Sequence, residues 1–140
     1  MAQVDLIEET YIAAAPAVVA AAVHDPAFAA ALWPDLDLTV FMDRGLEGVR
    51  WTAAGALVGS CEVWLEPFSD GVVVHTYVRC DPTGGAGAAV IILPPRAALR
   101  EAGSRARHAK QVLWRLKDRL EAGRAAGEPA VGAGRPAGGS

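Results

Sequence analysis

Two residues that could do acid–base chemistry, Glu62 and His75, stand at the two ends of the stretch EVWLEPFSDGVVVH. Apolar and polar residues alternate on both sides of SDG, which predicts a β-hairpin with a tight turn. A carboxylate and an imidazole on paired strands could move protons to and from a substrate. Two charged side chains on an outer sheet face would produce the same stretch, so the direction of each side chain decides between these interpretations.

Counting outward from a two-residue turn assigns each hairpin residue to one of two sheet faces. The first face is nearly all apolar and contains Cys61, Val63, Leu65, Val72, Val74, Thr76 and Val78. The second face carries Ser60, Glu62, Trp64, Val73, His75, Tyr77 and Arg79. An antiparallel sheet with one core face has this division, so we expect Glu62 and His75 on the outer face, in solvent or in an interface. If the turn has another length and this assignment of faces fails, Glu62, His75 and Arg79 become an acid–base set.

The other residues that could do chemistry give weaker signals. Cys61 and Cys80 lack C-x-x-C spacing, so we expect them to be small buried side chains. His24 is expected at a helix end and His108 on the polar side of a helix, and neither is predicted to be a ligand. The GGAG at residues 84–87 lacks the Lys and Ser/Thr of a phosphate loop, which favours a flexible lid or linker. The sequence therefore predicts no metal and no cofactor.

Composition limits the classes of function further. The chain has 140 residues, 52% of them hydrophobic, which is enough for one domain with a single core. Its formal net charge of −3 offers no basic surface to nucleic acid or to an anionic membrane. No run approaches the roughly 18 apolar residues of a membrane span, and the acidic start MAQVDLIEET is unlike a signal peptide. We expect a cytoplasmic protein that binds neither nucleic acid nor a membrane.

Hydrophobic periodicity predicts a mixed α+β order of elements. A first strand over residues 3–13 is followed by two short alanine-rich helices. The first helix is expected over 16–24, and the second from a cap at Asp25 to Trp33. Four alternating segments then predict an antiparallel meander of strands, over residues 36–43, 46–53, 57–66 and 71–80.

The longest helical segment, residues 96–123, carries one apolar stripe. The stripe consists of Leu99, Ala102, Ala106, Ala109, Leu113, Leu116 and Leu120. On a sheet, the leucine half can pack closely, whereas the alanine half leaves a gap that forms a pocket or is filled by larger sheet residues. The domain is expected to span residues 1–123, because residues 124–140 are rich in Gly, Ala and Pro, which predicts a disordered tail.

The strands before the hairpin extend the inner face. Trp51 points inward if the next connection has three residues or a bulge at Gly55 or Gly59. A two-residue turn across DRG would align Leu38 with Trp51 and Val40 with Val49. The inner face then comprises Leu38, Val40, Val49, Trp51, Val63, Val74, Thr76 and Val78. The first strand alternates poorly, so its inward residues stay open.

Several segments together resemble a known family. They are YIAAAPAVVAAAV after the first strand, the LWP stop, the WLEPFSDGVVV hairpin and the final HAKQVLWRLKDRLE. Over about residues 3–122 the chain is similar to the START-like (SRPBCC) superfamily, and most to its actinobacterial polyketide cyclase/dehydrase and lipid transport group. This resemblance implies a helix-grip fold, in which a curved sheet wraps the long helix and encloses an apolar pocket. The chain has fewer strands after LWP than the family, so we expect a shortened antiparallel sheet.

The leading expectation is a protein that binds a hydrophobic small molecule, such as a lipid or polyketide, between the sheet and the C-terminal helix. The expected pocket residues are Leu38, Val40, Trp51, Val63, Thr76, Val78, Ala102 and Ala106.

Two alternatives stay open. The first is a polyketide cyclase or dehydratase, for which Thr76 and Glu8 are the nearest polar groups, although Glu9 could also supply a carboxylate from the first strand. The second is a pocket-free module that forms a homodimer through Trp64 and Tyr77, because large aromatic residues on an outer face favour self-association.

Overall fold

The sheet has five antiparallel strands in the order β1-β5-β4-β3-β2. The structure, a computed structural model, describes residues 2–85, 89–124 and 127–132. The strands are β1 (Val4–Ile12), β2 (Leu36–Asp43), β3 (Gly48–Gly55), β4 (Leu57–Phe68) and β5 (Gly71–Pro82). The helices are α1 (Pro16–His24), α2 (Pro26–Leu32) and α3 (Pro95–Leu120), with a short 3-10 turn, η1 (Gly45–Glu47). The order predicted from the sequence is confirmed.

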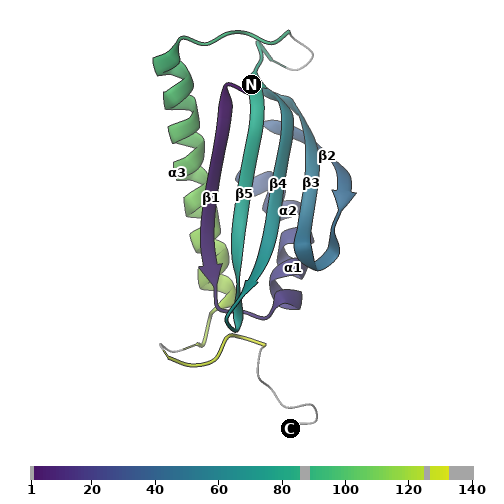
Figure 1. The fold of residues 1–140 in the computed structure, drawn as a ribbon, viewed down its shortest axis with the longest axis vertical. Coiled ribbons are helices and arrows are strands. Elements are labelled where there is room, and N and C mark those ends of the chain that lie inside the picture. Colours follow the sequence, from purple (N-terminus) through teal and green to yellow (C-terminus); the bar gives the residue numbers. More distant parts are fainter. Residues whose placement is uncertain (1, 86–88, 125–126, 133–140) are drawn as a thin grey trace.

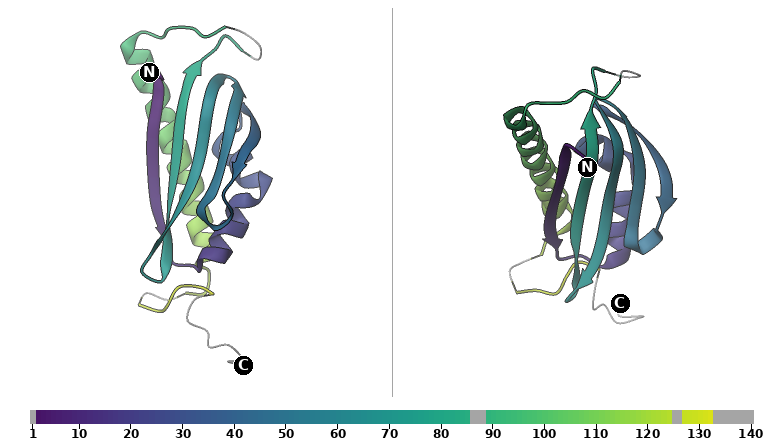
Figure 2. Two further views of the ribbon diagram at one scale, coloured as in Figure 1. Left: turned by 45° about the vertical axis from the view of Figure 1, so that its right-hand side comes forward. Right: turned by 45° about the horizontal axis from the view of Figure 1, so that its top comes forward.

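All three helices lie on one face of the sheet (Figure 1 and Figure 2). In these views α3 runs along β1, while α1 and α2 lie behind β3 and β4. We call the helix-covered face the inner face and the opposite face the outer face. The core fills the space between the sheet and the helices, and its buried residues include Val4, Ile12, Trp33, Trp51, Val63, Val74, Leu113 and Leu116.

Local signals set the ends of α1 and α2. Pro16 occupies the start of α1, where its missing N–H leaves no bond unmade. Asp25 caps α2, because its Oδ1 accepts a hydrogen bond from the Ala27 N–H at 3.0 Å. The chain leaves the helical conformation at Trp33, directly before Pro34. Both helices therefore have the bounds that the caps and prolines predicted.

The β4–β5 hairpin has the predicted register. Glu62 pairs with Tyr77, and Trp64 pairs with His75, so all four lie on the outer face. The β3–β4 register is also confirmed, because Trp51 pairs with Cys61 and is buried on the inner face. Gly55 and Gly59 have φ values of 107° and 150°, and these left-handed conformations provide the irregular connection that an inward Trp51 requires.

The predicted β2–β3 register is wrong by two residues. Leu38 pairs with Ala53, and Val40 pairs with Trp51. The connection is longer than a two-residue turn because η1 follows β2, and a bulge at Phe41 shifts the register between Val40 and Met42. Successive residues of a strand point to alternate faces, so a difference of two residues does not change the face. Leu38 and Val40 therefore still share a face with Trp51.

The apolar stripe of α3 is confirmed only in its second half. Ala109, Leu113 and Leu116 are buried, together with Val112. Leu99 is 73% exposed, so the prediction that it faces the sheet is wrong. The stripe failed at this end because the first turns of α3 have no apolar partner surface, and a charged side chain occupies the space beneath the next turns.

Part of the expected disordered tail pairs with the domain. The Val131 N–H donates to Ala13 O at 2.8 Å, and the Ala15 N–H donates to Val131 O at 2.7 Å. Ala130 is buried, and Val131 packs against the core. Residues 127–132 therefore contact the domain, and the predicted end of the domain at residue 123 stays a prediction. Residues 125–126 and 133–140 of the tail, and 86–88 of the glycine-rich loop, lie outside the described residues.

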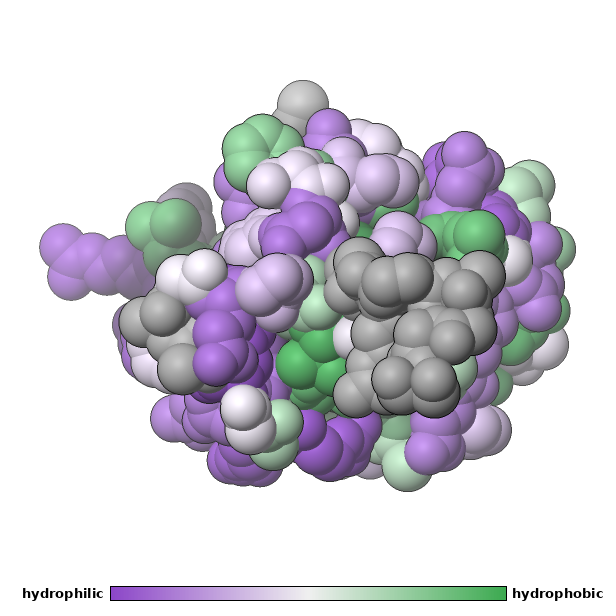
Figure 3. Space-filling model, turned by 90° about the horizontal axis from the view of Figure 1, so that it is seen from below, coloured by the Kyte–Doolittle hydropathy of each residue, from purple (hydrophilic) through white to green (hydrophobic). Residues whose placement is uncertain are grey.

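The end of the domain near this tail segment is mainly hydrophilic. Seen from below (Figure 3), hydrophobic atoms are visible in a depression between hydrophilic side chains. An apolar segment that docks at this end can cover such groups, as Ala130 and Val131 do.

Candidate functional site

A hollow of about 380 Å³ lies on the inner face, between the α1–α2 region and strands β2 and β3. We call it the inner hollow. Its walls are mainly apolar and include Val23, Ala29, Leu36, Leu38, Val40 and Trp51. Its size falls within the roughly 300–1,000 Å³ of small-molecule sites. The inner hollow is therefore large enough and apolar enough to hold a hydrophobic ligand.

Trp51 is held in place by a second tryptophan. The ring of Trp33, which follows α2, meets the ring of Trp51 edge to face, with centroids 5.6 Å apart and planes at 68°. Both side chains are buried. On the other side, Val40 lies on the edge strand β2 and is 54% exposed. The inner hollow thus has a rigid aromatic wall and an open side at the sheet edge.

A charged pair lies at the edge of the inner hollow. His24 Nε2 is 2.9 Å from Asp43 Oδ1, and His24 Nδ1 is 2.7 Å from Ala20 O. Burial alone would lower the pKa of His24, but these two acceptors outweigh it and raise the pKa above its ordinary value. Hydrogen bonds from the Gly45 N–H and from His24 lower the pKa of Asp43. Both ring nitrogens of His24 are engaged, so the pair is a closed ion pair rather than a free base.

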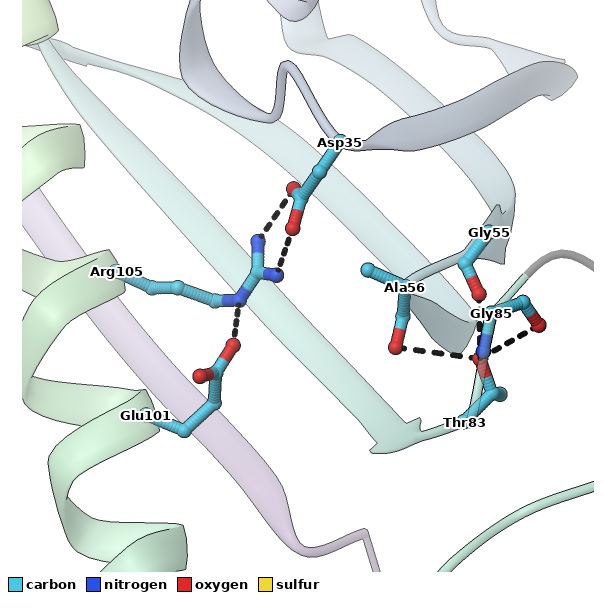
Figure 4. A network of polar contacts seen from close by, with 7 residues as sticks. All are labelled: Asp35, Gly55, Ala56, Thr83, Gly85, Glu101 and Arg105. Atoms are coloured by element: carbon cyan, nitrogen blue, oxygen red, sulfur yellow. Dashed lines mark hydrogen bonds and ion pairs between the residues drawn. The ribbon is translucent and has the colours of Figure 1, made fainter.

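The space beneath the first half of α3 is filled by Arg105 (Figure 4). Its Nη1 and Nη2 donate to the two carboxylate oxygens of Asp35 at 3.0 and 2.6 Å, and its Nε donates to Glu101 at 2.7 Å. The Arg105 side chain is only 12% exposed. Burial would raise the pKa of Asp35, but the hydrogen bonds and charge of Arg105 outweigh it and lower that pKa. The gap expected under the alanine half is thus bridged by a guanidinium.

The eight expected pocket residues do not line a common cavity. Leu38, Val40 and Trp51 line the inner hollow. Three others, Val63, Thr76 and Val78, are buried in the core. Ala102 and Ala106 are half-buried on α3, on the helix that carries Arg105. The apolar hollow therefore lies under α1 and α2, and three of the eight expected residues line it.

Sequence reasoning missed the helical wall of the inner hollow. Val23, Ala29 and Ala30 come from the two short helices. A signal was present, because small alanine side chains in both helices leave room between helix and sheet. The pattern was too uniform to show which alanines face β2 and β3, so the pocket was assigned to the more clearly amphipathic helix.

On the outer face, Glu62 lies between two arginines. Arg44 Nη1 donates to Glu62 Oε2 at 2.9 Å. Arg50 Nε lies 3.0 Å from Glu62 Oε1 as an ion pair, but its angle does not meet that of a hydrogen bond. The carboxylate is mostly covered by this arrangement. Glu62 is therefore bound in a charged network and has no contact with His75.

His75 is buried although it lies on the outer face. It is 7% exposed, and its ring stacks on Trp64 with centroids 4.5 Å apart. Its Nδ1 is 2.8 Å from Glu9 Oε2, and its Nε2 is 3.0 Å from Glu66 Oε1. The expected direction of His75 is correct, but aromatic and acidic neighbours cover it instead of water.

The proposed acid–base residues have separate partners. Arg79 is exposed and lies 3.8 Å from Asp5, away from the contacts of Glu62 and His75. On the inner face, Glu8 pairs with Lys110 of α3 at 3.0 Å, whereas Glu9 points outward to His75. Thr76 is buried beside β1. Of these groups the structure joins Glu9 to His75, whereas Glu62, Arg79 and Glu8 have other partners.

Among the described residues, no group of three or more His, Cys, Asp or Glu side chains has an arrangement that could hold a metal ion. In the same part of the chain, none of the helices combines the length and the apolar composition that a membrane crossing requires.

No protein-family model matches the chain, and no curated protein matches it. Among solved structures, DR_A0006 from Deinococcus radiodurans matches with a TM-score of 0.58 and 14% identity, over 85% of this chain and 98% of that one. The Aha1 dimer from Colwellia psychrerythraea matches with a TM-score of 0.54 and 16% identity, over 87% of this chain and 99% of that one. At these identities the likeness is one of fold. With its five-stranded antiparallel sheet and long C-terminal helix, the chain has the predicted α+β helix-grip fold.

Proposed function

We propose that the chain binds a hydrophobic small molecule in the inner hollow. The observation that carries this proposal is an apolar hollow of about 380 Å³ with one wall fixed by the Trp33–Trp51 contact. Burial of apolar ligand surface against such walls is favourable by about 25 cal/mol per Å². The helix-grip fold is consistent with a ligand-binding domain, and the chain's resemblance to a lipid and polyketide group supports a lipid-like or polyketide-like ligand.

The edge of the inner hollow suggests how such a ligand would lie. The apolar part would contact Leu38, Val40 and Trp51, and a polar end would remain near the His24–Asp43 pair. A cyclase or dehydratase would also need a titratable group that is free to exchange a proton with the ligand. His24 and Asp43 are bonded to each other, so we propose binding as the function of this site.

A bulky side chain in the inner hollow tests this proposal. Ala30 lines the hollow and is exposed, so Ala30→Trp should fill it without crowding the core. We expect this change to weaken binding of the neutral fluorophore N-phenyl-1-naphthylamine by about tenfold or more, as loss of a buried contact worth about 1.4 kcal/mol would. Fluorescence titration measures the dissociation constant.

The matched control is Ala21→Trp, which adds the same side chain at an exposed position of α1 that does not line the hollow. It should bind the fluorophore as the unchanged protein does. Equal affinity in the Ala30 and Ala21 variants, both folded by circular dichroism, would show that the probe does not occupy the inner hollow.

Self-association through the outer face is a second candidate. Ile7, Phe41 and Met42 are large exposed apolar residues, and they come from β1 and β2, whose outer faces flank Trp64 and Tyr77. One structure of the same fold is described as a dimer, the Aha1 protein of Colwellia psychrerythraea. However, the charged Arg44–Glu62–Arg50 network lies on the same face, and charged residues are depleted from interface cores. Self-association therefore ranks below ligand binding.

A further inference from the structure

A second hollow, of about 640 Å³, lies on the outer face, on the other side of the sheet from the inner hollow. We call it the outer groove. Its lining includes the side chains of Arg44, Arg50, Ser60, Trp64, Tyr77 and Arg79. The chain segment from Phe41 to Glu47 forms one wall, and β3, β4 and β5 contribute the rest. The outer groove is thus built from sheet residues that are held in register by their strands.

The outer groove collects positive charge in an acidic protein. Arg44, Arg50 and Arg79 line it, against two carboxylates, Glu47 and Glu62. The whole chain has a formal net charge of −3. A cleft with one excess sign of charge concentrates its field on a ligand of the opposite sign. The outer groove is therefore suited to an anion.

Two of these guanidinium groups have N–H donors that are available to a ligand. Arg50 contacts Glu62 through Nε alone, and even that contact lacks hydrogen-bond geometry. Arg79 is 64% exposed and is held only by a 3.8 Å contact from Nε to Asp5. Among the described residues, neither pair of Nη atoms has a hydrogen-bond partner on the protein. A guanidinium with both Nη atoms free can bind a carboxylate through two parallel hydrogen bonds.

The aromatic residues add a rigid flat surface beside these donors. Trp64 is held by its stack on His75, and His75 is held in turn by Glu9 and Glu66. Tyr77 lies beside the same imidazole, with ring centroids 6.3 Å apart. Aromatic rings that are already fixed lose little conformational entropy when a planar ligand stacks on them.

We infer that the outer groove binds a small planar organic acid. Its ring would contact Trp64 and Tyr77, and its carboxylate would receive hydrogen bonds from both Arg50 and Arg79. This site lies across the sheet from the inner hollow, so the inference does not depend on the function proposed for that hollow.

Calorimetric titration with 2-naphthoate tests the inference, with 2-naphthylmethanol as the uncharged ligand of the same shape. Binding of the acid and not of the alcohol is expected. Arg79→Gln and Arg50→Gln should each weaken 2-naphthoate binding by about tenfold, the effect of losing one charge-assisted hydrogen bond. Arg100→Gln is the matched control, because Arg100 is exposed on α3 and does not line the outer groove. It should leave the affinity unchanged.

Three results would overturn the inference. The first is equal affinity for the acid and the alcohol. The second is undiminished binding in both Arg50→Gln and Arg79→Gln. The third is loss of 2-naphthoate binding in Ala30→Trp, which would place the acid in the inner hollow. Arg79 is exposed and only loosely paired, so its replacement keeps the test valid even if Arg50→Gln fails to fold.

Discussion

A single arginine places a charge in the space under the first half of α3. Arg105 joins α3 to Asp35, the residue before β2, and to Glu101 one helical turn earlier. Arg105→Met keeps most of the apolar stem but leaves two carboxylates unpaired. We expect a loss of about 1–2 kcal/mol of unfolding free energy, because Asp35 and Glu101 are partly exposed and water offsets some of the penalty. Urea denaturation measures the loss.

The same residue pair predicts a pH dependence. The pKa of Asp35 is below its ordinary value in the folded chain, so its contribution is present above about pH 4 and is lost as pH falls through the folded pKa. Arg105→Met should therefore lose less stability than the unchanged protein between about pH 4 and pH 2. Arg100→Met is the control. If Arg105→Met and Arg100→Met lose the same unfolding free energy as the pH falls over this range, the bridge does not stabilise the fold.

At the scale of elements, residues 127–132 dock against the end of the domain through hydrogen bonds. Val131 bonds to the chain before α1, and the Ala130 N–H donates to Asp70 Oδ2 in the β4–β5 turn at 2.8 Å. Deleting residues 125–140 removes these bonds and the buried contacts of Ala130 and Val131. We expect the chain to lose about 1 kcal/mol, since each hydrogen bond contributes about 0.5–1.5 kcal/mol and ordering the segment costs entropy. Thermal melting followed by circular dichroism shows the shift.

Truncation after Gly132 is the matched control for this deletion, because it leaves the contacts of Ala130 and Val131 in place. Its melting temperature should equal that of the full chain. If both truncations melt at the same temperature, the docked segment contributes nothing, and the domain ends with α3.

At the scale of the whole molecule, the two sheet faces carry different chemistry. The inner face holds the core and an apolar hollow, and the outer face holds buried His75 within aromatic and charged groups. We expect the protein to sediment as a monomer, because a dimer through the outer face would have to remove water from the Arg44–Glu62–Arg50 network. Trp64→Ala should not change the sedimentation coefficient. If the unchanged protein is a dimer and Trp64→Ala dissociates it, self-association through the outer face is favoured. The partner subunit would then cover the outer groove.

The sequence by itself determined the parts of the fold that depend on near neighbours in the chain. Prolines and the Asp25 cap set both ends of α1 and α2, because they act within one helical turn. The alternation around SDG assigned Glu62 and His75 to the outer face, since side-chain direction in a hairpin follows from turn length alone. The inward direction of Trp51 followed instead from the apolar pattern of its strand, because the length of the next connection was left open.

Only the tertiary structure decided which surfaces meet. The β2–β3 register depended on η1 and on a bulge at Phe41, which alternation does not reveal. Arg105, a polar residue in the sequence pattern, reaches Asp35 across 70 positions of the chain, and the apolar hollow is formed under α1 and α2. The tail docks through hydrogen bonds of Val131 with Ala13 and Ala15, which its own composition does not show. Each of these contacts joins distant segments, and their free energy depends on a geometry that exists only after folding.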